Sequence, residues 1–303
     1  MPPKELEKLI QTATQGGDAS AQFLLGMTYL QGKGVNKDDL EAMKWFRQAA
    51  KQGLAKAQFS LGMMYSQGKG VPRNDKEAVK WFKLAAEQGL ISAQFNLGVL
   101  YDTGNGVPKD GNEAKKWYQL AAQKGYPNAQ FNLGMLYRRG KGVPRNDSEA
   151  IKWFKLAASQ GFAKAQYNLG MIYENDHDLA DADQEALKWF RMAADQGLPM
   201  AQYSVALIFM EGKGVPKDDK EAANWLRQAA DRGYADAQNM LGTLYTKGKG
   251  VAPDNIQAYM WFHLAAEQGH ATAIDRREHL TDALNPTQLS QAQALARNWK
   301  PIA

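Results

Sequence analysis

One 36-residue pattern constrains this chain more than any other feature, because it is written seven times in succession. Its clearest copy reads AQFSLGMMYSQGKGVPRNDKEAVKWFKLAAEQG at residues 57–89. The pattern's glycine recurs at Gly26, Gly62, Gly98, Gly134, Gly170 and Gly242, with Ala206 in the remaining copy. Its tryptophan recurs at Trp45, Trp81, Trp117, Trp153, Trp189, Trp225 and Trp261. A fixed period of this length, without insertions, predicts a stack of helical repeats in place of a globular domain.

Composition agrees with a folded repeat array and excludes several classes of protein. Of the 303 residues, 44% are hydrophobic and 23% are charged, which favours a continuous core over disorder. The absence of cysteine excludes disulfides and thiolate chemistry. The formal net charge of +5 permits contact with an acidic partner, nucleic acid or a membrane surface, but requires none of them.

The sequence leaves the cellular compartment open. No stretch approaches 18 consecutive apolar residues, so we expect no membrane span. The first residues, MPPKELEKLIQTA, lack the hydrophobic region of a signal peptide. The expected location is therefore periplasmic or secreted if a leader was removed, and otherwise cytoplasmic.

Each repeat predicts a helix, a loop and a second helix. The first helix is expected at about residues 19–31, with Gly26 in its interior where a neighbouring helix packs too closely for a side chain. Asp or Asn followed by Glu three residues later predicts a reciprocal capping box at the second helix, as in Asp38 and Glu41. That helix is expected to bury Ala42, Trp45, Phe46, Ala49 and Ala50.

The motifs Ala-Gln-x-x-Leu-Gly-x-x-Tyr, Gly-x-Gly-Val, Glu-Ala-x-x-Trp and Ala-Ala-x-x-Gly resemble those of the Sel-one-like repeat, a relative of the tetratricopeptide repeat. This resemblance implies an all-α fold, a right-handed superhelical solenoid of antiparallel helix pairs. It also implies a non-enzymatic scaffold for protein–protein interaction, often a bacterial adaptor of the envelope, of host contact or of secretion. It brings no catalytic residues and no cofactor.

The repeat boundaries predict three parts. Residues 1–17 read as a capping half-repeat, because Ala13 and Gly17 precede Ala49 and Gly53 by one period. Residues 18–269 hold the seven repeats, and residues 270–303 read as two C-terminal capping helices. The fifth repeat departs from the others, since an acidic loop, Asp176–Asp183, replaces its Gly-Lys-Gly-Val-Pro.

The chemical motifs that the chain offers do not form a recognised site. Gly32-Lys33-Gly34 lacks the spacing and the Ser or Thr of a phosphate-binding loop. The four histidines form no metal motif, and no serine lies in a nucleophile elbow. The loop Asp176–Asp183 does not follow the calcium-loop spacing, so we expect no metal there. The sequence thus predicts neither an enzyme nor a cofactor, metal or small-molecule site.

A basic stripe on the second helices supports an alternative function. Its members include Lys44, Lys80, Lys116, Lys152 and Lys188, and such a stripe can follow a phosphate backbone. A glutamate three residues before each of these lysines predicts local ion pairs instead. Binding of nucleic acid or an anionic surface therefore remains the alternative.

The favoured function is binding of a protein or peptide in the concave groove by a monomeric chain. Its candidate residues lie on the first helices, opposite the side that packs in the core, and combine aromatic, methionine and variable polar side chains. They are Phe59, Met63, Phe95, Asn96, Phe131, Asn132, Met135, Arg138, Arg139, Tyr167, Asn168, Met171 and Tyr203. The aromatic members have a second interpretation, which is packing against the next repeat. Because the polar columns vary between repeats, we expect replacement of Asn132, Arg138 and Arg139 to leave stability unchanged.

Overall fold

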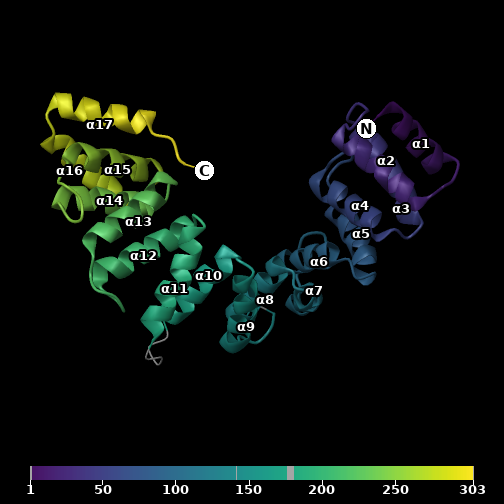
Figure 1. Cartoon of the computed structure of the whole chain (residues 1–303), viewed down its shortest axis with the longest axis horizontal. Helices are drawn as coiled ribbons and strands as arrows, with labels where there is room; N and C mark the ends of the chain where they lie inside the picture. The colour runs from purple at the N-terminus through teal and green to yellow at the C-terminus, as the bar shows by residue number, and fades with distance from the viewer. Residues whose placement is uncertain (1, 141, 176–180, 303) are drawn as a thin grey trace. The chain divides into compact units, whose positions relative to one another are not determined.

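A computed structural model describes residues 2–140, 142–175 and 181–302, and in these residues the chain forms helices and loops without any strand. The chain divides into two compact units, Met1–Leu156 and Ala157–Ala303 (Figure 1). The first unit contains α1 (Pro3–Thr14), α2 (Ala19–Gln31), α3 (Asp39–Lys51), α4 (Ala55–Gln67), α5 (Asp75–Glu87), α6 (Ile91–Thr103), α7 (Gly111–Gln123) and α8 (Pro127–Arg139). Helix α9 (Asp147–Ser159) contains the boundary. The second unit contains α10 (Ala163–Glu174), α11 (Ala182–Asp195), α12 (Pro199–Glu211), α13 (Asp219–Asp231), α14 (Ala235–Lys247), α15 (Asn255–Glu267), α16 (Ala271–Ala283) and α17 (Pro286–Asn298).

The predicted all-α fold of repeated helix pairs is confirmed. Within each unit, the first helix of a repeat packs most closely against the second helix of the same repeat, and that second helix packs against the next first helix. In the first unit α1 packs on α2, and in the second unit α17 packs on α15. No described helix has both the length and the apolar run needed to cross a membrane.

In six of the seven repeats, the first helix packs a glycine against an aromatic ring of the same repeat. A Cβ atom added to Gly26 would lie 2.7 Å from Cδ1 of Phe46, and one added to Gly62 would lie 2.6 Å from Cδ1 of Phe82. The same relation holds at the glycines of the other repeats, with Tyr118, Phe154, Phe190 and Phe262 as the rings. The close approach predicted for the glycine column is therefore confirmed, and its partner is now identified.

In six of the seven repeats, the residue that follows the tryptophan is better buried than the tryptophan itself. Phe46 and Phe154 are 0% exposed, whereas Trp45 and Trp153 are half-buried. The prediction that the whole tryptophan column lies in the core is wrong for most repeats, although Trp117 and Trp261 are buried. The cause is geometric, because the Phe side chain points at the glycine of its partner helix and the tryptophan packs at the border of the preceding cluster.

The described side-chain N-caps of the second helices form only one half of the predicted capping box, which is the bond from the helix backbone to the side chain of the capping residue. In α3, the Asp38 carboxylate accepts from the backbone N–H groups of Leu40 and Glu41 at 2.9 and 3.0 Å. The other half, in which the Asp38 N–H would donate to the Glu41 carboxylate, is absent. The Asp38 N–H donates instead to the Tyr29 carbonyl at 3.0 Å, and none of the described caps of the repeats forms a complete box. A complete capping box occurs in α17, between Asn285 and Gln288.

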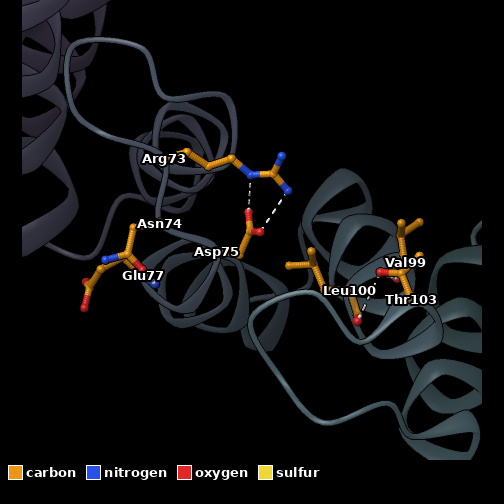
Figure 2. Close-up of polar contacts among 7 residues, drawn as sticks. All are labelled: Arg73, Asn74, Asp75, Glu77, Val99, Leu100 and Thr103. Carbon is orange, nitrogen blue, oxygen red and sulfur yellow. Dashed lines mark hydrogen bonds and ion pairs between the residues drawn. The ribbon is translucent and has the colours of Figure 1, made fainter.

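The loops of the first, second, fourth and sixth repeats combine left-handed glycines with a short-range ion pair. In Figure 2, the Arg73 guanidinium reaches the carboxylate of Asp75, with Nη2 and Oδ2 2.8 Å apart, beside the cap that Asn74 provides for Glu77. The second glycine of the next loop, Gly106, has φ +74° and lies so close to α5 that a Cβ would meet the Asp75 carbonyl carbon at 2.4 Å. This glycine is therefore needed both for its left-handed backbone and for the contact between repeats.

A row of buried glutamines links successive repeats. Gln58 in α4 is 5% exposed, and its side-chain N–H donates to the Ala50 carbonyl at the end of α3, at 3.3 Å. The Gln58 side-chain oxygen accepts from Nε2 of Gln88, thirty residues further along the chain, at 2.7 Å. Equivalent carbonyl bonds are made by Gln22, Gln94, Gln130, Gln166, Gln202 and Gln238. The glutamine of the Ala-Gln motif thus satisfies a helix end that packing would otherwise bury.

Candidate protein-binding surface

Four of the five aromatic candidates on the first helices contact aromatic rings of the second helices, and the fifth, Tyr203, contacts a ring in the turn before α14. In the first unit, the ring centres of Phe59 and Phe82 are 5.5 Å apart, and those of Phe95 and Tyr118 are 6.0 Å apart. Phe131 makes the same contact with Phe154. In the second unit Tyr167 lies 5.5 Å from Phe190, while Tyr203 makes an edge contact with Tyr234. All of these candidates are half-buried, so each stabilises its repeat and still presents an edge of its ring at the surface.

The methionine candidates are half-buried in the same way. Met63 packs against the cluster formed by α5 and α6, and Met171 packs against the large cluster of the second unit. Because an unbranched thioether side chain adapts to neighbours of different shape, these positions suit recognition of a variable partner.

The three asparagine candidates differ from one another. Asn96 donates to the carbonyl of Ser92, and Asn168 donates to the carbonyl of Lys164, each at 2.8 Å and each within its own helix. Asn132 instead donates to the Tyr118 hydroxyl in the preceding repeat at 3.2 Å. Asn132 therefore has a packing role that the sequence comparison of repeats did not predict.

Two arginines end α8 and give this part of the first unit a local positive charge. Arg138 is half-buried and Arg139 is exposed. Their position in the last turn of a helix is favourable, because helix carbonyls carry partial negative charge there. The matching positions in the second repeat hold Ser66 and Gln67, so the helix itself does not require arginine at this point.

The candidates are divided between the two units. Phe59, Met63, Phe95, Asn96, Phe131, Asn132, Met135, Arg138 and Arg139 belong to the first, and Tyr167, Asn168, Met171 and Tyr203 belong to the second. They therefore form two candidate surfaces, one on each unit.

Five lysines of the basic stripe form ion pairs with glutamates of their own helices. The ammonium groups of Lys44, Lys80 and Lys152 lie 2.5 Å from the carboxylates of Glu41, Glu77 and Glu149. Further pairs join Lys116 to Glu113 and Lys188 to Glu185. Such exposed pairs contribute little stability, but they reduce the net field that a phosphate backbone would meet.

The acidic stretch of the fifth repeat is only partly described. Residues 176–180 of Asp176–Asp183 lie outside the described residues. In the part of the chain that the structure does describe, no three His, Asp or Glu side chains gather as a metal site would require. Helix α11 begins within this stretch, at Ala182, without a side-chain cap at Asp181, in contrast to the Asp and Asn caps of α3, α5, α7 and α13.

Taken together, the helix pairs, the glycine–aromatic contacts and the glutamine row define an α-solenoid whose repeats are built to stack. The Sel1 repeat profile matches residues 19–54, 55–90, 91–126, 127–162, 163–198, 199–234 and 235–270. The chain belongs to the Sel1 repeat family, as its motifs suggested. Proteins of this family are generally non-enzymatic scaffolds for protein interaction.

Two solved structures show what the chain is similar to. A Sel1 repeat protein from Oxalobacter formigenes is 37% identical, with a TM-score of 0.79, over 91% of this chain and 80% of that one. The protective antigen c5321 of uropathogenic Escherichia coli, which displays an SLR fold, is 28% identical over 97% of this chain and 94% of that one, with a TM-score of 0.41. A comparison with curated proteins gives no match.

Proposed function

We propose that the chain is a scaffold that binds a protein or peptide through the first-helix surface of one or both units, the predicted concave side. The observation that carries this proposal is the partial exposure of the apolar candidate side chains. Phe59, Met63, Phe131 and Met135 are only half-covered by the second helices that they pack against. Adaptable apolar side chains with polar neighbours are typical of protein-binding surfaces.

We further propose that the polar specificity of the first unit comes from Arg138 and Arg139. These side chains replace a Ser-Gln pair of the second repeat, and they lie one to two turns beyond Met135 and Asn132 on α8. Arginine is enriched where interfaces are strongest, because its planar guanidinium binds carboxylates and aromatic faces. A bacterial adaptor of the envelope, of host contact or of secretion fits this proposal, and the 37% identity to the Oxalobacter protein supports its bacterial origin.

Site-specific photo-crosslinking tests the proposed surface. A benzophenone amino acid at Met63 or Met135 is expected to capture partner protein, and the same group at Lys80 or Lys152 on the second helices is the matched control. Replacement of Arg138 by Ser and Arg139 by Gln, which copies the second repeat, is expected to reduce capture at Met135 at least about tenfold.

Crosslinking at the lysine positions alone would contradict the proposal. It would transfer the function to the second-helix side, where an anionic surface or nucleic acid is the expected partner. That alternative predicts a steep fall in binding with salt, because binding there would depend on released counterions.

A further inference from the structure

The C-terminal residues of the second unit fold back over a turn between repeats. Trp299 has an extended backbone, with φ −68° and ψ 142°, and the segment that follows passes over Gly233. Cη2 of Trp299 and Cβ of Pro301 lie 3.7 and 3.9 Å from the place where a Gly233 Cβ would be. The Ile302 N–H donates to the carbonyl of Asp231 at 2.8 Å. An extended Trp-Lys-Pro-Ile segment therefore occupies this turn.

Two other turns between repeats are covered by cationic side chains. Nζ of Lys124 donates to the Gly89 carbonyl at 2.8 Å. The Arg232 guanidinium lies 3.2 Å from the position of a Gly197 Cβ. These turns follow the C-terminal ends of second helices, where carbonyls lack helical partners and carry partial negative charge. The groups that cover the three turns are the Ile302 N–H, Lys124 and Arg232, and each is a hydrogen-bond donor or a cation.

The turn at Gly53 is uncovered. Nothing lies within 4 Å of the place where its Cβ would be, which also holds for Gly125, Gly161 and Gly269, and Gly53 stands five periods before Gly233. A groove of about 530 Å³ runs beside this turn, between the start of α2 and the start of α6. Its lining includes Ser20, Phe23, Gly53, Lys56, Gln88 and Gly89. Lys51, the equivalent of Asp231, offers the matching carbonyl at the end of α3.

We propose that the Gly53 groove binds an extended peptide of a separate partner protein, one that carries an aromatic and a proline residue in close succession. The chain's own tail shows the mode, with a ring on the turn glycine, a proline beside it and a backbone N–H on the helix-end carbonyl. Phe23 supplies an aromatic wall, and Gly53 allows the peptide to approach the backbone. The proposal rests on the proposed function and names the partner chemistry for one end of the first-helix surface.

The test uses the synthetic peptide Arg-Asn-Trp-Lys-Pro-Ile, the sequence of residues 297–302, and nuclear magnetic resonance of the full ¹⁵N-labelled chain. Saturable shifts are expected at Gly53, Gly89 and the Gln88 side-chain amide. A matched peptide with Ala in place of Trp and Pro should bind at least tenfold more weakly. Ser20→Trp, at an exposed groove position, should also weaken binding tenfold or more, whereas Lys164→Trp at the equivalent column of α10 should not.

Three results would overturn the proposal. Shifts confined to Gly233 would mean that the peptide merely exchanges with the chain's own tail. Equal binding by the Ser20→Trp variant would place the peptide elsewhere. Self-association of the chain that is lost in Ser20→Trp would make a second copy the occupant. None of these results affects crosslinking at Met63 or Met135, so the proposed function and this groove can fail separately.

Discussion

Gly170 lies under Phe190 so closely that a Cβ on the glycine would be 2.5 Å from Cδ1 of the ring. In the next repeat the corresponding residues are Ala206 and Leu226, both fully buried. The added methyl group on one helix therefore coincides with a smaller side chain on the other. This paired change shows that each repeat's two helices are matched to one another across a single contact.

We expect Leu226→Phe to destabilise the second unit by about 1–3 kcal/mol, because the ring would be forced against the Ala206 methyl group. Adding Ala206→Gly should restore most of the loss, since the double variant copies the pair found in the other repeats. Urea unfolding of the wild type, both single variants and the double variant measures the coupling energy. Additive effects of the two changes would contradict a direct contact.

A second prediction separates the phenylalanine from its neighbouring tryptophan. Phe154→Ala should lower the free energy of unfolding by about 3–5 kcal/mol, the usual loss for a fully buried aromatic side chain. Trp153→Ala should lower it by less, because Trp153 is only half-buried. Because repeats couple mainly to their neighbours, the Phe154 variant is also expected to broaden or split the thermal transition. Calorimetry of the two variants provides the comparison, and a larger effect at Trp153 would restore the tryptophan as the main residue of the core.

A third prediction concerns a gap in the glutamine row. The side-chain oxygen of Gln94 is buried without a hydrogen-bond partner among the described residues, because Lys124 stands where Gln88 stands one repeat earlier. Lys124→Gln should supply the missing donor and stabilise the first unit by about 1 kcal/mol. Gln52 donates both to Gln22 and to the Gly17 carbonyl, so glutamine can also replace the bond from Lys124 to Gly89.

The control for this change is Lys51→Gln, an exposed position in α3 for which the same substitution should leave the melting temperature within a degree or so. No gain in the Lys124 variant, or an equal gain in both, would show that the Gln94 oxygen is satisfied in solution.

Acid should weaken the second unit through His263. Burial lowers the pKa of His263, and Arg277 and Arg297 lower it further, against the opposing charge of Glu267. Its ring stacks on Tyr259, and its Nδ1 is buried without a partner among the described residues. The unfolded chain therefore takes up a proton at a higher pH than the folded chain, so stability present above about pH 6.5 is lost as the pH falls.

His263→Gln should reduce this dependence between about pH 7 and pH 5, while His279→Gln, at an exposed position of α16, should retain it. Urea midpoints of the three proteins at each pH provide the measurement. Parallel pH profiles for the wild type and the His263 variant would remove His263 as the cause.

The repeat itself made much of the fold predictable. The 36-residue period placed α2 at Ala19–Gln31, and the glycine at position 26 indicated a close helix contact. The period could not show that Phe46 and not Trp45 makes that contact, because the two are adjacent and both are aromatic. It also could not show the bond from Gln88 to Gln58, since that bond depends on how successive repeats stack.

The candidate surface was less predictable, because its side-chain contacts also depend on how successive repeats stack. Helical spacing selected Phe59 and Met63 for the outer side of α4, and the structure shows both half-buried. Variation between repeats predicts freedom from packing, but Asn132 donates to the Tyr118 hydroxyl of the preceding repeat. Asn96 and Asn168 occupy the same column, and their partner positions hold Phe82 and Phe154, which have no hydroxyl, so the asparagine does not follow its neighbour from repeat to repeat. The contact of Asn132 therefore becomes visible only when the two side chains are seen together in the structure.

The last prediction follows from that pair. Asn132→Ala should cost about 1–3 kcal/mol in the first unit, because it leaves the Tyr118 hydroxyl buried without its donor. Asn96→Ala is the matched control, since Asn96 bonds only within its own helix and its loss should cost less than about 0.5 kcal/mol. In a Tyr118→Phe background, Asn132→Ala should become as mild as the control, because five of the other repeats place Phe at that position and the sixth repeat places Leu226 there, and neither residue needs a donor. Urea unfolding of the four variants decides the matter: an equal cost of Asn132→Ala with and without the tyrosine hydroxyl would mean that the bond contributes nothing, and Asn132 would then be as free as Arg139 to serve a partner.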